Sequence, residues 1–187
     1  MSLIERRVPD GDTTLTLIAR YDNRLRKTVR WTVQHDQIVV RVPRHLRRPE
    51  LERILDQVVE KVRRQRARAR RRQDRDLHAR AEAINRRYFG GELNWHTIRW
   101  VTNMEKRLGS CSSGGSTDGD IRISERVRHW PDYVVDYIIA HELAHRKHPN
   151  HSRAFWDYLA RYPLAERARG FLEGIAYAEH GSADDML

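Results

Sequence analysis

The feature that most restricts how this chain can fold is an apolar helical segment built around His141-Glu142-Leu143-Ala144-His145. Pro131 is typical of the start of a helix, and Pro149 prevents the helix from continuing. We therefore predict one helix from about Pro131 to Pro149. On such a helix the two histidines lie one turn apart, on the face begun by Val134 and Ile138, which should be buried.

Two imidazoles one helical turn apart can point at one ion, while Glu142 points sideways toward a water on that ion. Zinc accepts tetrahedral nitrogen ligands and keeps a position for water in catalytic sites. Burying two histidines without hydrogen-bond partners lowers the stability of the fold, and a bound metal removes this cost. A chance match to this pattern occurs in roughly a few per cent of chains of such histidine content. The apolar setting favours a zinc site with Glu142 as general base.

A third protein ligand is required, and two histidines follow the motif closely. On a straight helix His148 would lie about 10 Å along the axis from His141, too far for both to reach one ion at about 2 Å. Pro149 breaks the helix and allows the chain to turn back. The predicted metal ligands are therefore His141, His145 and His151.

Other residues are weaker candidates for a role in the site. Glu166 or Glu173 could supply the third ligand instead, although both are typical of solvated helix surface. Phe155 and Trp156 should pack as core beneath the metal. Cys111 is a single thiol, and a buried thiol more often packs as a small apolar residue. A donor for the developing oxyanion could come from Tyr137, Tyr158, Tyr177, His129 or His148, and packing is the commoner role of each tyrosine.

The first half of the chain combines strands with a long helix. Alternating apolar and polar residues predict strands at 13–20 and 28–34, and the second of these forms a hairpin with 37–42. A helix begins near Pro49, and its apolar residues recur at helical spacing as far as Val62. Its continuation is almost devoid of apolar residues, so the segment is one helix or two with a polar midsection in solvent.

The second half begins where Gly90-Gly91 stops that helix. Strands at 97–101 and 120–124 are predicted to form a second hairpin. The later strand could pair with an extended substrate peptide, or it could equally be an ordinary internal strand. After the motif helix, further helices are predicted at 152–161 and 164–173. The order of strands, helix, strands and helices gives an α+β fold.

The net charge of +10 is concentrated in one segment. Between Lys61 and Arg75 nine cationic residues stand against one acid, Asp74, which accounts for +8 of that charge. Such a segment could contact the phosphates of DNA or RNA. It lacks aromatic residues for base stacking, and most charged helices are only solvated surface. A nucleic-acid-binding protein with a structural or vestigial zinc site is therefore the alternative function.

Cys111 is the only cysteine, so no internal disulfide can form and a reducing compartment is expected. The chain has no apolar run long enough to cross a bilayer, and its first residues lack a signal-peptide core. We expect a cytoplasmic protein without membrane association.

Residues 141–156, His-Glu-Leu-Ala-His-Arg-Lys-His-Pro-Asn-His-Ser-Arg-Ala-Phe-Trp, resemble the signature of the YgjP-like metallopeptidases, which are related to the SprT and WLM groups. Residues 107–112 resemble that family's Arg-Trp-Gly-Ser-Cys-Ser segment, with Leu108 in place of tryptophan. The resemblance implies a zincin-like fold and hydrolysis of protein or peptide substrates. In such folds the segment that resembles residues 107–112 borders the cleft, which implies that Cys111 could lie near the metal. The resemblance also implies zinc bound by His141, His145 and His151, with Glu142 as the catalytic residue.

Together these features predict three regions. Residues 1–89 should form the N-terminal hairpin and the long basic helix. Residues 90–180 should form a zincin-like metallopeptidase core, with a small sheet, the motif helix and C-terminal helices. Residues 181–187 should form a flexible tail.

Overall fold

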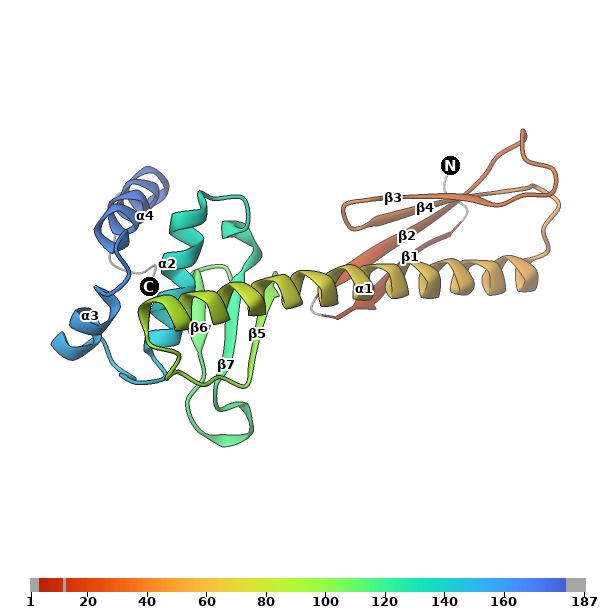
Figure 1. Cartoon of the computed structure of the whole chain (residues 1–187). Helices are drawn as coiled ribbons and strands as arrows, with labels where there is room; N and C mark the ends of the chain where they lie inside the picture. Colours follow the sequence, from red (N-terminus) through yellow and green to blue (C-terminus); the bar gives the residue numbers. More distant parts are fainter. Residues whose placement is uncertain (1–3, 12, 181–187) are drawn as a thin grey trace. The chain divides into compact units, whose positions relative to one another are not determined.

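The computed structural model describes residues 4–11 and 13–180. The chain forms two compact units, residues 1–70 and 71–187 (Figure 1). This division falls inside the long helix, whereas the boundary expected from the sequence lies at its end. The predicted tail, 181–187, lies outside the described residues.

The first unit contains a four-stranded sheet with the order β1-β2-β4-β3. Its strands are β1 (Ile4–Asp10), β2 (Thr13–Tyr21), β3 (Arg30–Gln34) and β4 (Gln37–Val42). The predicted hairpin is confirmed, because β3 and β4 pair antiparallel. The sheet also contains a parallel pair, β2 with β4, and an edge strand, β1, that the sequence did not predict. Pro9 obscured that strand, since proline is tolerated only at sheet edges or bulges.

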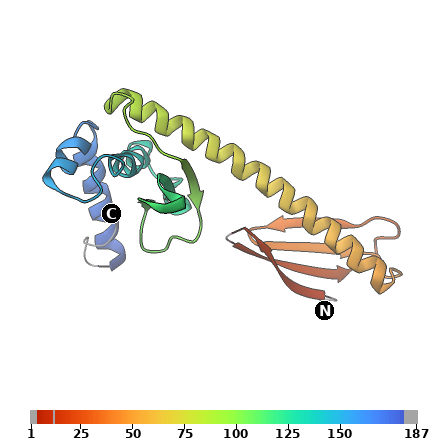
Figure 2. The ribbon, with the colours of Figure 1, turned by 90° about the horizontal axis from the view of Figure 1, so that it is seen from below.

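One continuous helix, α1 (Arg48–Tyr88), follows β4. Its N-terminal part packs on one face of the sheet (Figures 1 and 2), as the apolar spacing predicted. The buried helix residues in this contact are Leu51, Leu55, Val58, Val59 and Val62. The opposing sheet residues include Leu15, Leu17, Ile38 and Val40. Burying such side chains fully stabilises a fold by about 1.5–3 kcal/mol each, so this contact alone can hold helix and sheet together.

The second unit contains a three-stranded sheet with the order β5-β7-β6. The strands are β5 (Thr97–Val101), β6 (Gly109–Cys111) and β7 (Asp120–Ser124). The predicted hairpin between β5 and β7 is wrong, because these strands run parallel and β7 pairs antiparallel with β6 instead. A parallel pair requires a crossover, and the connection through β6 supplies it. The central place of β7 also excludes pairing of this strand with a substrate.

Three helices complete the second unit: α2 (Asp132–Ala144), α3 (Arg153–Leu159) and α4 (Ala165–His180). Short 3-10 turns lie at Gly115–Thr117 and Glu125–Val127. The predicted start of α2 is confirmed, but the predicted continuation to Pro149 is wrong. The helix ends at Ala144, where the backbone N–H groups of Lys147 and His148 both donate to the Ala144 carbonyl and tighten the chain into a turn.

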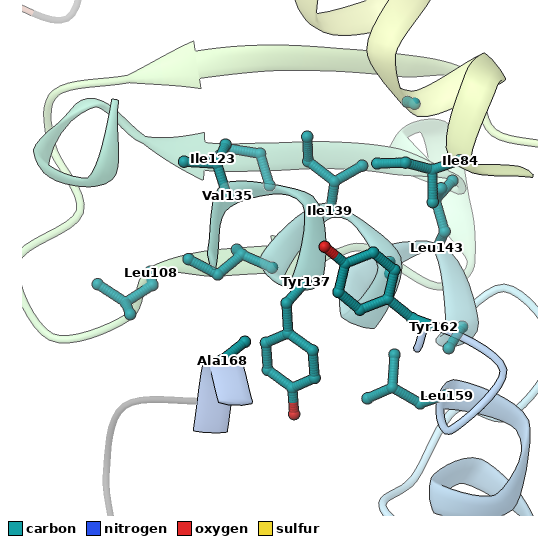
Figure 3. Packing of buried hydrophobic residues seen from close by; sticks show 14 of the residues in the cluster. Ile84, Leu108, Ile123, Val135, Tyr137, Ile139, Leu143, Leu159, Tyr162 and Ala168 are labelled. Carbon is teal, nitrogen blue, oxygen red and sulfur yellow. The ribbon is translucent and has the colours of Figure 1, made fainter. Parts of the chain in front are cut away.

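The core of the second unit is built around α2 (Figure 3). Ile139 and Leu143 lie near Ile84 of α1, while Val135 lies near Ile123 of β7. Leu159 of α3 and Ala168 of α4 cover another side of the helix. Because α2 is buried on nearly all sides, polar residues on it need specific partners. In the described part of the chain no helix is long and apolar enough to span a membrane.

Candidate metal centre

Three histidine rings meet at the C-terminal end of α2. His141 lies in the last turn of the helix, His145 directly follows it, and His151 lies two residues before α3. The Nε2 atom of His141 is 3.2 Å from that of His145 and 2.9 Å from that of His151. The candidate ligand atoms of the three rings all lie within 4.8 Å of one another. The turn after α2 thus brings together the three histidines expected from the sequence.

The chemistry of these rings fits a divalent cation. The Nδ1 atom of His145 donates to the His148 carbonyl oxygen at 3.2 Å, which leaves a lone pair on Nε2. Burial lowers the pKa of His141 well below its ordinary value, and the neighbouring imidazoles add to this effect, so its ring is neutral. Converging neutral imidazoles cannot all satisfy one another. Two nitrogens on one tetrahedral zinc lie about 3.3 Å apart, close to the spacing found.

Aromatic residues of α3 pack against the triad of His141, His145 and His151. The ring centroid of Phe155 lies 4.8, 4.7 and 4.8 Å from those of His141, His145 and His151. Phe155 is fully buried, as predicted. Trp156 is not core: it is 37% exposed and stacks on His151 with ring centroids 5.4 Å apart. Helix α3 begins just before these residues, so consecutive positions point to different sides.

Glu142 lies on α2 beside the triad and is buried. Burial raises the pKa of its carboxyl to about 8, and the Arg107 guanidinium opposes this in part. The side chain occupies space that Gly109 of β6 leaves free, since a Cβ at Gly109 would lie 2.4 Å from Glu142 Oε1. A carboxyl whose pKa lies near neutrality is suited to accept and return a proton at neutral pH.

We expect Gly109→Ala to lower any hydrolytic activity by about 100-fold, because it displaces the Glu142 carboxylate by a fraction of an ångström to an ångström. Metal content should stay unchanged, since Gly109 does not belong to the histidine cluster. The measurement is kcat/KM together with metal content. Gly170→Ala on α4 is the matched control, because a Cβ there meets nothing within 4 Å. Equal activity of the two variants would contradict the close packing of Gly109 on Glu142.

The alternative third ligands lie elsewhere. Glu166 and Glu173 are exposed on α4, and neither belongs to a metal-binding cluster in the residues that the structure describes. The His148 ring packs edge-on against Tyr158, with centroids 5.4 Å apart. Its carbonyl oxygen, as the acceptor for His145, orients a ring of the triad.

The tyrosines considered for the oxyanion have mainly packing roles. Tyr158 donates its hydroxyl to Glu92 at 2.7 Å, and Tyr177 is 76% exposed. Tyr137 is buried, and burial raises its pKa to about 12. Among the described residues its hydroxyl has no hydrogen-bond partner, and the same is true of Nδ1 of His141. These two rings lie 6.3 Å apart, centroid to centroid.

Cys111 lies on β6, partly buried against the core of the second unit. Burial raises the pKa of its thiol to about 11, and the negative charge of Glu142 contributes. The group therefore stays a neutral thiol and packs as a small apolar residue, as the sequence favoured. It does not belong to the histidine cluster.

Sequence reasoning missed Arg146, which follows the triad residue His145 directly. Its guanidinium contacts both carboxylate oxygens of Asp118, at 3.1 and 2.9 Å, and Nε donates to the Asn94 carbonyl at 2.9 Å. Arg146, followed by the Gly114 N–H, lowers the pKa of Asp118 to about 2. This ion pair fixes the loop after β6 to the end of α2. The contact is long-range, and no local pattern indicates it.

The family model described as YgjP-like, metallopeptidase domain, matches residues 90–173, which include the whole histidine cluster and Glu142. These residues form a YgjP-like metallopeptidase domain. The family expected from the motif segments is thereby confirmed, and so is the peptidase class of the domain. No curated protein matches the chain.

One solved structure is similar to this chain. It is the metallopeptidase zymogen abylysin of Pyrococcus abyssi, with 21% sequence identity and a TM-score of 0.46. The similarity covers 59% of this chain and 99% of abylysin.

Proposed function

We propose that this metallopeptidase uses zinc and cleaves bonds within polypeptide chains, with His141, His145 and His151 as the metal ligands and Glu142 as the general base. The observation that carries the proposal is the convergence of three neutral imidazoles next to a buried carboxylate that has no ligand role in the cluster. Three nitrogen ligands leave one tetrahedral position for water, which distinguishes catalytic from structural zinc sites.

When bound, zinc would supply a Lewis acid that polarises the scissile carbonyl and makes the attacking water more acidic. Glu142 accepts a proton from this water as the oxygen attacks the carbonyl carbon. It then delivers the proton to the amide nitrogen as the carbon–nitrogen bond breaks, so the amine leaves neutral. Phe155, packed against all three rings, keeps the imidazoles in place during both steps.

The edge strand β6 supports an endopeptidase rather than an exopeptidase. It pairs only with β7 in the described sheet, so its outer edge can accept a substrate in extended conformation. Gly109, at the start of β6, touches the space occupied by Glu142. A peptide added along this strand would pass beside the carboxylate with chain continuing in both directions. This assigns to β6 the substrate pairing that the sequence suggested for β7.

Metal analysis is the direct test of the cofactor. Purified protein should contain about one zinc ion per chain, and a chelator should remove it, abolish hydrolysis of an unfolded protein substrate and lower the Tm. Added zinc should restore all three properties. Hydrolysis that persists after complete removal of metal would contradict the proposal, and so would protein that binds no zinc at micromolar concentration.

A further inference from the structure

The first unit carries almost all of the net charge of the chain. Residues 1–70 contain 18 cationic and 9 acidic residues, which gives +9 of the total of +10. Part of this charge is used internally. Arg66 and Arg70 both bind the buried carboxylate of Asp10, at 2.8 and 3.0 Å, and Arg63 donates to the Pro9 carbonyl. These arginines of the basic segment of α1 therefore hold the sheet against the helix.

Other arginines lie in a row across the sheet. Arg20 of β2 is the register partner of Arg41 of β4, and Arg41 is in turn the register partner of Arg30 of β3. Register partners point to the same face of a sheet. This face is the one opposite α1, because the alternate residues Ala19 and Val40 are buried in the contact with the helix.

Nothing within the described part of the chain neutralises this row. All three arginines are exposed, and none of them forms an ion pair with a described residue. Like charges placed directly opposite one another destabilise a sheet. Other exposed arginines of this unit, such as Arg53 and Arg68, also lack an ion pair with a described residue. The row differs from them because its three charges lie directly opposite one another on neighbouring strands. The row is therefore costly for folding alone, which indicates an anionic partner.

A shallow groove lies next to two members of the row. Its lining residues enclose about 450 Å³ and include Val39 and Thr32 as well as Arg30 and Arg41. Neighbouring strands lie about 5 Å apart, so the three arginine positions span about 10 Å. Two of the cations thus border a concave surface, and the third continues the line beyond it.

We propose that this arginine row, Arg20, Arg30 and Arg41, binds the phosphate backbone of duplex DNA. Duplex DNA carries one negative charge per about 1.7 Å of axis, so a row of this length faces about six phosphate charges. The groove beside the row contains one aromatic residue, Trp31, which is half-buried against the core of the first unit. Its ring lies under the Lys61 ammonium, 5.0 Å from the ring centroid, so it is not available for base stacking. Binding should therefore be independent of DNA sequence and strongly dependent on salt.

The test compares two triple variants of the full chain with equal loss of charge. Arg20→Gln, Arg30→Gln and Arg41→Gln remove the row. Arg53→Gln, Arg64→Gln and Arg68→Gln remove three exposed arginines of α1. Binding of a 20-base-pair duplex of arbitrary sequence is measured between 50 and 200 mM salt, beside a single strand and anionic phospholipid vesicles. Circular dichroism and Tm verify that both variants fold.

The row variant should bind the duplex at least about tenfold more weakly at 100 mM salt, and the slope of log K against log salt should become shallower by about 2.7. Its Tm should not fall, because like-charge repulsion is removed. The α1 variant should change the affinity less than threefold. Equal losses in both variants would overturn the proposal, since binding would then follow total charge. The proposal would also be overturned if the wild-type protein did not bind the duplex at 50 mM salt. Binding of only the vesicles or only the single strand would overturn it as well.

Discussion

Glu142→Gln is expected to slow peptide hydrolysis by about 10²- to 10⁴-fold, the usual contribution of a general base. Glutamine fills the same volume but cannot take a proton from water, so the defect should appear in kcat. Zinc content and Tm should remain those of the wild type, since Glu142 is not in the histidine cluster. Steady-state kinetics on a denatured protein substrate, with metal analysis of the same samples, measure both properties.

The control for this substitution is Glu166→Gln, which makes the same chemical change on the exposed surface of α4. It should leave kcat unchanged. A Glu142→Gln protein that retains wild-type turnover would show that another group moves the proton. A variant that loses its zinc along with its activity would instead show that the carboxylate has a structural role.

His151→Ala is expected to weaken zinc binding by more than about 100-fold, because even outer-shell substitutions commonly cost about 10- to 100-fold. With only the two nitrogen ligands of His141 and His145 left, hydrolysis should fall to background. Competition with a chromogenic chelator measures the affinity. Turnover at saturating zinc then shows whether any activity returns when the weakened site is refilled.

His148→Ala is the matched control for His151→Ala. Its ring lies outside the cluster, while the carbonyl that orients His145 belongs to the backbone and survives the substitution. Zinc affinity of this variant should remain within about threefold of wild type. If His148→Ala lost zinc and His151→Ala kept it, the third ligand would have been assigned to the wrong histidine.

The parts of the site that were predictable from sequence are those built within a few residues of one another. His141 and His145 follow from helical periodicity, and the approach of His151 was inferred from Pro149, because a proline forbids the helix to continue past it. The end of α2 was predicted too late, because its position depends on how the following turn bonds back to the Ala144 carbonyl. The pattern of apolar and polar residues alone does not predict where this helix ends.

Contacts between segments that are distant in the sequence could largely not be predicted. Alternation predicted β5 and β7 as strands, but their parallel pairing depends on β6, a strand of only three residues, Gly109–Cys111. The close approach of Gly109 to Glu142 and the ion pair of Arg146 with Asp118 arise only once the sheet lies against α2. The row of arginines likewise depends on strand register, which no single strand reveals.

All three histidines of the cluster lie within the eleven residues from His141 to His151. A segment this short can wrap around an ion even when the remainder of the polypeptide has lost its structure, because closing a small loop costs little entropy. Affinity for the denatured chain subtracts from the stabilisation that a ligand gives the native one. Zinc should accordingly protect this enzyme against thermal unfolding less than its dissociation constant alone would imply, and the denatured protein should retain part of its metal.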